Sequence, residues 1–255
     1  MSRRGIVIAA VCAMILSVAL AWLGSAGSGI PVLTYHHVGS GSDWLYVSEA
    51  DFERQLVYLR EQGYTTISVA ELAQGLSGRA KLPSRPIVLT FDDGYDDNYQ
   101  KALPVLLRQG MRASFFVVTG KIGQPGYMSW QQAAKMQSQG MEIGSHTVHH
   151  YTLNEINLKE MERELRASRV MLESNLPAAA PVFANPFGET APAVVSLLQK
   201  TGYQAACSSV VGLNRPGENL FMIRRMSVPK PKFGLWEFRL RLWWLNLRDR
   251  LELER

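Results

Sequence analysis

The sequence is poor in cysteine. Its 255 residues include two cysteines, and one of them, Cys12, lies inside a long apolar run near the N-terminus. Cys207 is then alone in the rest of the chain, so no intramolecular disulfide is expected there. The chain also lacks internal repeats, and it has no low-complexity tract apart from a glycine- and serine-rich stretch at residues 24–29. These absences argue against a disulfide-bonded scaffold and against a repeat protein.

A concentrated basic surface is also missing from the central part of the chain. The formal net charge is +5, but no stripe of lysine and arginine interleaved with aromatic residues occurs there. Since proteins that bind nucleic acids need such a stripe to neutralise phosphates, we expect no nucleic acid partner. Basic residues near an anionic membrane surface explain the charge better. The apolar content of 47% allows a full core and one domain of the size of an enzyme.

The N-terminus carries a long uncharged apolar segment. Arg3 and Arg4 precede residues 6–23, a run of eighteen residues without a charge. Small residues at 24–27 leave a cleaved signal peptide open as one interpretation. We favour an uncleaved anchor, because the run is longer than the roughly 7–15 apolar residues of a typical signal peptide. The two arginines predict a cytoplasmic N-terminus and an exported, membrane-anchored body in the periplasm or at the cell surface.

From residue 30 onward, short β-rich runs alternate with helical segments. Strands are expected at residues 31–35, 65–68, 86–91, 113–118, 141–143, 181–183 and 203–207. Helices are expected at residues 48–63, 69–76, 98–109, 129–140, 157–175 and 192–200. Strands that alternate with helices predict an α/β protein with a parallel sheet, and the number of units favours a barrel over an open sheet.

The last segment, residues 233–255, differs in composition. Its apolar residues fall on one predicted helical stripe, which contains Trp236, Leu240, Trp243, Trp244, Leu247 and Leu251. The stripe is surrounded by four arginines, which are Arg239, Arg241, Arg248 and Arg250. Such a helix suits a membrane interface, and packing on the domain or on a second subunit is an equal alternative. We therefore divide the chain into an anchor and linker (1–29), a main domain (30–232) and an amphipathic tail (233–255).

Two stretches carry the chemistry that the sequence predicts. The apolar run 86–91 leads into Asp92 and Asp93, and two adjacent carboxylates repel each other unless a cation is near. His146 and His150 are spaced so that both imidazoles can face one metal ion. A site of one carboxylate and two histidines keeps open positions that activate water. The second carboxylate is then free to act as a general base.

These residues resemble the first two motifs of a known enzyme family. Thr-Phe-Asp-Asp-Gly (90–94) and His-Thr-x-x-His (146–150) are similar to motifs of the polysaccharide deacetylases, the NodB-homology domain of carbohydrate esterase family four. The resemblance extends over residues 30–228 and includes Met-Ser-Trp at 128–130. It implies a distorted (β/α) barrel that removes acetyl groups from N-acetylated sugars with metal-activated water.

The resemblance also implies roles for individual residues. Asp92 would be the general base, and Asp93, His146 and His150 would bind the metal. The expected cofactor is a divalent ion, most often Zn²⁺, with Co²⁺, Ni²⁺ and Fe²⁺ as alternatives. The metal and a backbone N–H, here that of Phe187, would stabilise the oxyanion.

Two features depart from the family pattern. The third motif, Arg-x-Pro-Tyr, reads Ala-Asn-Pro-Phe at residues 184–187, so Ala184 replaces the arginine that orients the general base. We predict that Arg225 takes over this role, with Arg224 as the alternative. The C-terminal Leu-x-His motif, which supplies the general acid in most members, is absent because no histidine follows His150.

A histidine near the N-terminus offers a replacement for that acid. Residues 33–38 resemble the Tyr-His-x-Val segment of the poly-N-acetylglucosamine deacetylases, whose barrel strands are circularly permuted. We assign His36 as the general acid and His37 as the less favoured choice, and capping of a strand is the alternative for both.

The expected function is removal of N-acetyl groups from an N-acetylglucosamine-containing extracellular polysaccharide. The permuted arrangement favours an exopolysaccharide as the substrate. The membrane would be a second partner, through the N-terminal segment and through the C-terminal helix. A catalytically inert glycan-binding protein and a hydrolase of another N-acyl or ester substrate are the alternatives.

Overall fold

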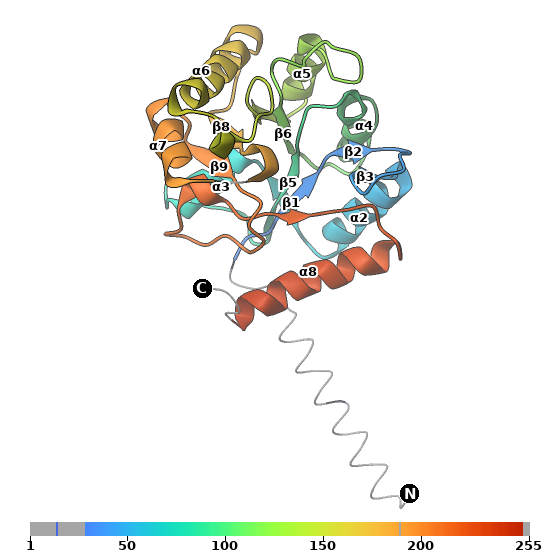
Figure 1. Ribbon diagram of the computed structural model, residues 1–255. Helices are drawn as coiled ribbons and strands as arrows, with labels where there is room; N and C mark the ends of the chain where they lie inside the picture. The colour runs from blue at the N-terminus through green and yellow to red at the C-terminus, as the bar shows by residue number, and fades with distance from the viewer. Residues whose placement is uncertain (1–13, 15–28, 189, 252–255) are drawn as a thin grey trace, which may run out of the picture.

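The computed structural model describes Met14, residues 29–188 and residues 190–251 (Figure 1). The predicted anchor at residues 1–29 therefore lies outside the described residues, apart from Met14 and Gly29. None of the helices in the described part of the chain combines the length and the apolar character that a membrane crossing requires.

The centre of the protein is a parallel sheet, which has eight strands in the described part of the chain. Neighbouring strands follow the order β10 (Met226–Ser227), β1 (Val32–Tyr35), β5 (Pro86–Phe91), β6 (Ser114–Val117), β7 (Glu142–Ser145), β8 (Val182–Ala184) and β9 (Ala205–Cys207), with β4 (Thr65–Ile67) beside β5. Every ladder in this sheet is parallel. The predicted α/β class with a parallel sheet is confirmed.

A short segment links the two edges of the sheet. Ile223 forms a parallel bridge with Cys207 of β9, and Met226 of β10 pairs with Leu33 of β1. The sheet curves into a half-barrel, and helices cover its outside (Figure 1). Because the strands are parallel, the carboxyl ends of β1, β5, β7 and β8 lie on the same side of the sheet.

Helices form at the segments that the sequence predicts. They are α2 (Glu49–Glu61), α3 (Val69–Leu76), α4 (Leu103–Arg108), α5 (Trp130–Ser138), α6 (Leu158–Asn175), α7 (Pro192–Lys200) and α8 (Leu235–Arg250), with 3₁₀ turns at Leu153–Glu155, Pro186–Gly188 and Leu220–Met222. The side chains of Ser48, Ser129 and Asn157 accept hydrogen bonds from backbone N–H groups three residues later. These caps satisfy N–H groups that have no partner within the helix, which is why the helices begin there.

Three local features differ from the sequence-based expectation, and one of them is β10, where no strand was expected. The predicted helix at 98–109 is split into a π-helical turn, Asn98–Ala102, and α4. Pro104 has no N–H to donate to the carbonyl of Gln100, and the N–H of Leu103 instead bonds the carbonyl of Asn98, five residues back. In addition, β2 (His37–Val38) and β3 (Tyr46–Val47) pair in a small second sheet that the sequence did not indicate.

The C-terminal helix α8 belongs to the main core. Its residues Phe238, Leu242 and Leu245 are buried within the same apolar cluster as the strands and α2. The ring of Phe238 lies edge-on to that of Tyr58 in α2, with 6.2 Å between centroids. Packing on the domain, one of the two alternatives for this segment, is therefore present in the structure.

The predicted tryptophan stripe of α8 faces away from this contact. Trp236 is 62% exposed and Trp244 is 50% exposed. Leu247 is an exception to the predicted stripe, because it is buried. Successive residues turn by about 100° around a helix, so the stripe and the Phe238 face lie on roughly opposite sides. The helix therefore carries two apolar faces, one inside the core and one outside.

Replacing Phe238 by alanine is expected to lower the free energy of unfolding by about 3–5 kcal/mol, because it empties a buried aromatic site. Replacing Trp236 by alanine should change it by less than about 0.5 kcal/mol, since that ring is mostly exposed. Urea unfolding of both variants measures the difference. Equal losses of unfolding free energy in the two variants would contradict the orientation of α8, in which Phe238 faces the core and Trp236 faces outward.

Candidate active site

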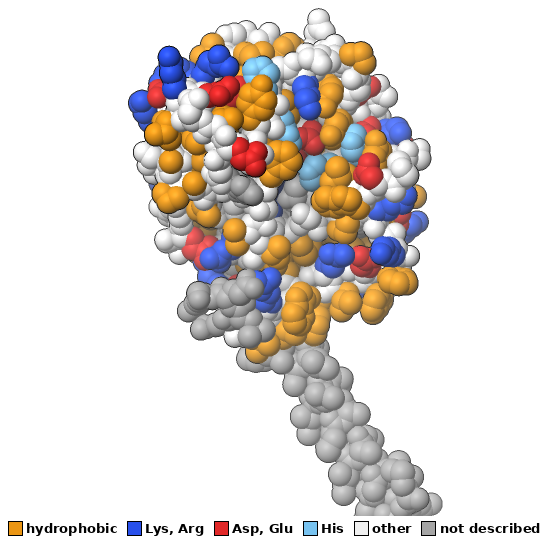
Figure 2. Space-filling view, viewed as in Figure 1, with side chains coloured by type: hydrophobic (Ala, Val, Ile, Leu, Met, Phe, Trp, Pro, Cys, Tyr) orange, Lys and Arg blue, Asp and Glu red, His pale blue; other side chains and the backbone are white. Residues whose placement is uncertain are grey.

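A hollow of about 470 Å³ opens at the carboxyl ends of the strands. Figure 2 shows histidine and acidic side chains close together on the face turned to the viewer. Every site residue that the sequence predicts lines this hollow: His36, Asp92, Asp93, His146, His150, Phe187 and Arg225. They come from segments far apart in the chain, and the parallel sheet brings them to one edge.

Asp93, His146 and His150 form a compact group of possible metal ligands. One ligand atom from each lies within 4.8 Å of the others. The Oδ1 atom of Asp93 is 3.2 Å from His150 Nε2 and 3.6 Å from His146 Nε2. One carboxylate and two imidazoles on one side of an ion leave its other positions open to water or substrate.

The state of His146 fits a metal ligand. Its Nδ1 atom lies 2.7 Å from the carbonyl oxygen of Ala184, which can only accept a hydrogen bond. Nδ1 therefore carries the proton, and Nε2 presents its lone pair toward Asp93. Burial lowers the pKa of His146, which favours the neutral ring that binds metals. These residues fit a divalent cation.

Asp93 is held ionised. Burial works to raise the pKa of its carboxyl group, but the hydrogen bond from His150 and the neighbouring imidazoles outweigh it, so the pKa is lowered. Burial, together with the neighbouring carboxylate of Asp93, raises the pKa of Tyr95. The sequence reasoning missed Tyr95, although its position two residues after Asp93 places it on the same loop.

The loop between His146 and His150 is held by a buried carboxylate. Glu164 of α6 accepts hydrogen bonds from the backbone N–H groups of Val148, at 3.0 Å, and His149, at 2.9 Å. It also lies 2.6 Å from His149 Nδ1. No motif in the sequence singles out Glu164, but its place on the buried face of α6, beside Leu165 and Ser168, is unusual for a carboxylate and is a signal for such a role.

Asp92 forms a buried, bidentate ion pair with Arg225. The two nitrogen–oxygen distances are 2.8 Å and 2.9 Å. Burial alone would raise the pKa of Asp92 and lower that of Arg225, but each charge stabilises the other and both shifts are reversed. Arg224 points elsewhere and pairs with Glu218 at 3.2 Å. The geometry thus favours Arg225 over Arg224 as the partner of Asp92.

His36 and His37 lie in different surroundings. His36 lines the hollow, and its ring is 6.2 Å from that of Trp44. The ring of His37 is stacked between Tyr46, at 4.1 Å, and Tyr95, at 3.6 Å, and its Nδ1 lies 2.6 Å from Asp97. His37 therefore packs behind the hollow, whereas His36 faces it.

The backbone around the hollow is strained. Among the described residues, four that are not glycine have a positive φ, and all four lie here: Asp93, Thr147, His150 and Phe187. Side chains other than glycine adopt this conformation only when the surrounding structure enforces it, and such residues gather at functional sites. Phe187 has a φ of 57° and places its ring 4.9 Å from that of His150.

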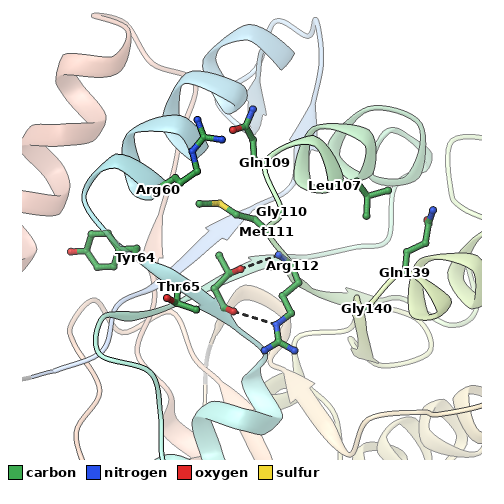
Figure 3. Close-up of a pocket in the computed structure, with 11 residues that line it drawn as sticks. Arg60, Tyr64, Thr65, Leu107, Gln109, Gly110, Met111, Arg112, Gln139 and Gly140 are labelled. Atoms are coloured by element: carbon green, nitrogen blue, oxygen red, sulfur yellow. Dashed lines mark hydrogen bonds between the residues drawn. The ribbon is translucent and has the colours of Figure 1, made fainter.

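A second hollow, of about 610 Å³, lies near the other end of the strands. Figure 3 shows Arg112 among the residues that line it, and the backbone N–H and Nε of Arg112 donate hydrogen bonds to Thr66. The residues that line it include no aspartate, glutamate, histidine or cysteine. The groups that can perform hydrolytic chemistry are gathered at the first hollow.

The fold and the site define a class: a parallel α/β protein with an Asp-His-His group that can hold a metal ion, beside a second, ionised carboxylate. The family model for polysaccharide deacetylases matches residues 79–206. The chain is 30% identical over 199 residues to the Bacillus subtilis protein YxkH, whose name assigns it to these enzymes. That match covers 78% of this chain and 71% of YxkH. The chain belongs to the polysaccharide deacetylase family, a family of N-deacetylases.

Two further relatives carry the name poly-β-1,6-N-acetyl-D-glucosamine N-deacetylase. The protein of Staphylococcus aureus strain MSSA476 is 22% identical over 201 residues, which cover 73% of this chain and 69% of the relative. The Escherichia coli K12 protein is 27% identical over 139 residues, which are 47% of this chain but only 21% of that longer protein.

Solved structures share the fold. IcaB from Ammonifex degensii superposes with a TM-score of 0.77 at 27% identity, covering 87% of this chain and 98% of IcaB. The Streptococcus pyogenes deacetylase PplD, in complex with acetate, gives a TM-score of 0.78 at 23% identity, with 84% and 98% covered. The latter likeness is evidence for the fold alone.

Replacing Arg225 by alanine is expected to lower the free energy of unfolding by about 3–5 kcal/mol at neutral pH, because Asp92 would remain buried without its partner. In the wild type, the pKa of Asp92 is lower in the folded state than its value of about 4 in the unfolded chain. This difference stabilises the fold at pH values above about 4, and the stabilisation is lost as the pH falls further. The deficit of the variant should therefore shrink in acid. Urea unfolding at several pH values measures it.

Arg224→Ala is the matched control for this experiment. Its side chain is partly exposed and pairs with a partly exposed carboxylate, so its loss should cost less than about 1 kcal/mol. A deficit of Arg225→Ala that is no larger, or that does not depend on pH, would contradict the buried pair.

Replacing Glu164 by leucine is expected to weaken metal binding by about 10- to 100-fold, because the loop between the two histidine ligands loses its anchor. Glu164→Gln should lose less, since its carbonyl oxygen can still accept the two N–H groups. Titration with zinc against a chromophoric chelator measures the affinity. Glu162→Gln, on the same helix and paired with Lys200, is the control. Wild-type affinity in a folded leucine variant would refute the role.

Proposed function

We propose that the protein is an exported, divalent-metal-dependent enzyme that removes N-acetyl groups from a polysaccharide containing N-acetylglucosamine. One observation carries the proposal: the Asp-His-His triad and the Asp92–Arg225 pair line the same hollow. Water activation and proton removal need these two parts within reach of one bound acyl group.

Asp93, His146 and His150 would hold the metal in this proposal, with zinc as the expected ion. A bound divalent ion would lower the pKa of water and polarise the acyl carbonyl. The protein's own contribution is to fix the ligands: the Ala184 carbonyl orients His146, and Glu164 holds the loop that carries His150. The three side chains are therefore already in position before a substrate binds.

Asp92 would act as the general base. Arg225 keeps its carboxylate ionised and fixes the plane of the group, while each oxygen retains a lone pair that can accept a proton from water. The missing arginine at Ala184 was the argument for an inert glycan-binding protein. That argument weakens, because Arg225 reaches Asp92 from another part of the chain.

His36 would act as the general acid and Phe187 would donate its backbone N–H to the oxyanion. In the net reaction, the carbon–nitrogen bond of the amide breaks and a carbon–oxygen bond to water forms. One proton of the water passes to Asp92, and the leaving nitrogen takes a proton from His36. The products are acetate and a free amine on the sugar.

The substrate class rests on the relatives and on the rim of the hollow. The Staphylococcus aureus and Escherichia coli relatives are named for poly-β-1,6-N-acetyl-D-glucosamine. Trp44 and Phe187 are 59% and 62% exposed at the hollow and offer flat apolar surfaces to sugar rings. An extracellular polymer also agrees with the predicted N-terminal anchor, which remains part of this proposal.

Acetate release from β-1,6-linked N-acetylglucosamine oligomers tests the function. We expect release that stops with a chelator and returns with zinc. Asp92→Asn should lower kcat by about 10²- to 10⁴-fold, because it removes the base. Metal content, measured by emission spectroscopy, should stay at the wild-type level in this variant.

His36→Ala separates the acid from a ligand in the same assay. A sharp loss of turnover with unchanged metal content supports the acid, whereas loss of the metal would make His36 a ligand. Release from β-1,4-linked but not β-1,6-linked oligomers would shift the substrate class. No release from either, with metal bound, would favour another N-acyl or ester substrate.

A further inference from the structure

The outer side of α8 carries a second apolar surface. We call it the aromatic face, and it consists of Phe233, Trp236, Leu240, Trp244 and Leu251. We infer that this face binds an anionic lipid surface and seats the protein on a membrane. The inference goes beyond the proposed chemistry, and one of its supports, the position of the N-terminal anchor, rests on the proposed function.

The aromatic face gathers exposed residues on one side of the helix, although Leu247, on the same side between Trp244 and Leu251, is buried. Its members recur at intervals of three, four and seven residues, which keeps them on one side of a helix. Trp236 and Trp244 are at least half exposed, and Phe233 just before the helix is 75% exposed. The core contact of α8 uses the opposite side, through Phe238 and Leu242. Folding of the described chain therefore leaves the aromatic face unused.

The charges around the aromatic face suit an anionic partner. Residues 230–249 contain five basic side chains, which are Lys230, Lys232, Arg239, Arg241 and Arg248, and two acidic ones. Both acidic groups are paired with arginine: Glu237 with Arg241 at 2.8 Å, and Asp249 with Arg215 at 2.6 Å. The surface is consequently net positive, and tryptophan with arginine is the composition of helices that lie in a lipid interface.

The start of the described domain lies close to the same helix. The N–H of Ile30 bonds the carbonyl of Asn214 at 2.8 Å, and the next residue, Arg215, holds Asp249 of α8. Residues 24–29 separate Ile30 from the apolar run 6–23, and six residues reach about 20 Å when extended. If residues 6–23 span the bilayer, Ile30 is kept within about 20 Å of its surface, and the end of α8 lies close to Ile30 through the contact of Arg215 with Asp249.

A second copy of this chain fits the aromatic face less well. Pairing two such faces would place their basic side chains against one another without added acidic groups, and like charges repel. An anionic bilayer offers both an apolar interior and negative charge. In Figures 1 and 2, α8 lies along the lower edge while the histidine-lined hollow opens toward the viewer. A membrane along α8 thus leaves the hollow accessible to a polymer.

A fluorescent label tests the contact in the full-length protein. Cys207 is buried, so a Cys12→Ala background with Leu240→Cys takes a bimane label on the aromatic face. Val170→Cys on α6 is the matched control, because it is similarly exposed and shares the same anchor. The proteins are reconstituted in phosphatidylglycerol–phosphatidylcholine vesicles whose acyl chains carry bromine, a quencher that acts at short range.

We expect quenching at position 240 to exceed that at position 170 by about twofold or more in anionic vesicles, and to fall in phosphatidylcholine alone or in high salt. Equal quenching at the two positions would overturn the inference. The inference would also be overturned if, in detergent without lipid, the label at position 240 became shielded from solvent as the protein concentration rises. That result would mean that a second copy of the chain covers the aromatic face.

The same preparations separate this inference from the proposed function. Acetate release from soluble oligomers depends on the hollow and not on lipid contact. The double variant Trp236→Ser/Trp244→Ser should therefore still release acetate. When Leu240→Cys is added to this double variant and labelled, the label should no longer be quenched by the brominated lipid. Selective quenching without acetate release would support the membrane contact and show that the proposed activity is wrong. Acetate release without selective quenching would support the proposed activity and overturn the membrane contact.

Discussion

The buried ion pair between Asp92 and Arg225 is the interaction on which the arrangement of the site depends. Two charges removed from water are tolerated only when each satisfies the other with good geometry. Arg225 meets this requirement with two short bonds to Asp92 and a third, at 3.0 Å, to the carbonyl of Ser208. The pair joins residues 133 positions apart in the chain. Folding of the C-terminal part of the domain is therefore coupled to completion of the site.

The same segment that delivers Arg225 also connects the edges of the sheet. Ile223 bridges to β9 and Met226 pairs with β1, so Arg225 lies between two backbone attachments. This position explains how an arginine from the end of the domain can serve an aspartate that follows β5. The family pattern places the arginine on the strand that here ends in Ala184. The backbone carbonyl oxygen of Ala184 orients His146.

The group of Asp93, His146 and His150 shows how a rigid scaffold supports strained loops. Asp93 and His150 both have left-handed backbone conformations, which are unfavourable for these residues by themselves. Glu164 holds the loop that carries His150, and it is not itself one of the three grouped residues. A product with free amines is cationic, so an enzyme seated on an anionic surface by α8 would release its product where that surface retains it.

Local signals in the sequence determined much of this protein. Helix caps, glycine stops and β-rich runs predicted the order of strands and helices, because those signals act over a few neighbouring residues. The two motifs also identified Asp92, Asp93, His146 and His150 as a group, since they follow strands whose carboxyl ends must meet in a parallel sheet.

Other features were decided only by the tertiary structure. Arg224 and Arg225 are adjacent and chemically identical, and only the path of residues 223–227 determines which of them reaches Asp92. The sequence favoured His36 over His37 only through a family resemblance, and the structure separates them physically, because His37 is stacked between two tyrosines. Glu164 and the inner face of α8 are defined by contacts with distant segments. Short-range patterns carry no information about such contacts, because they form only when the whole chain packs.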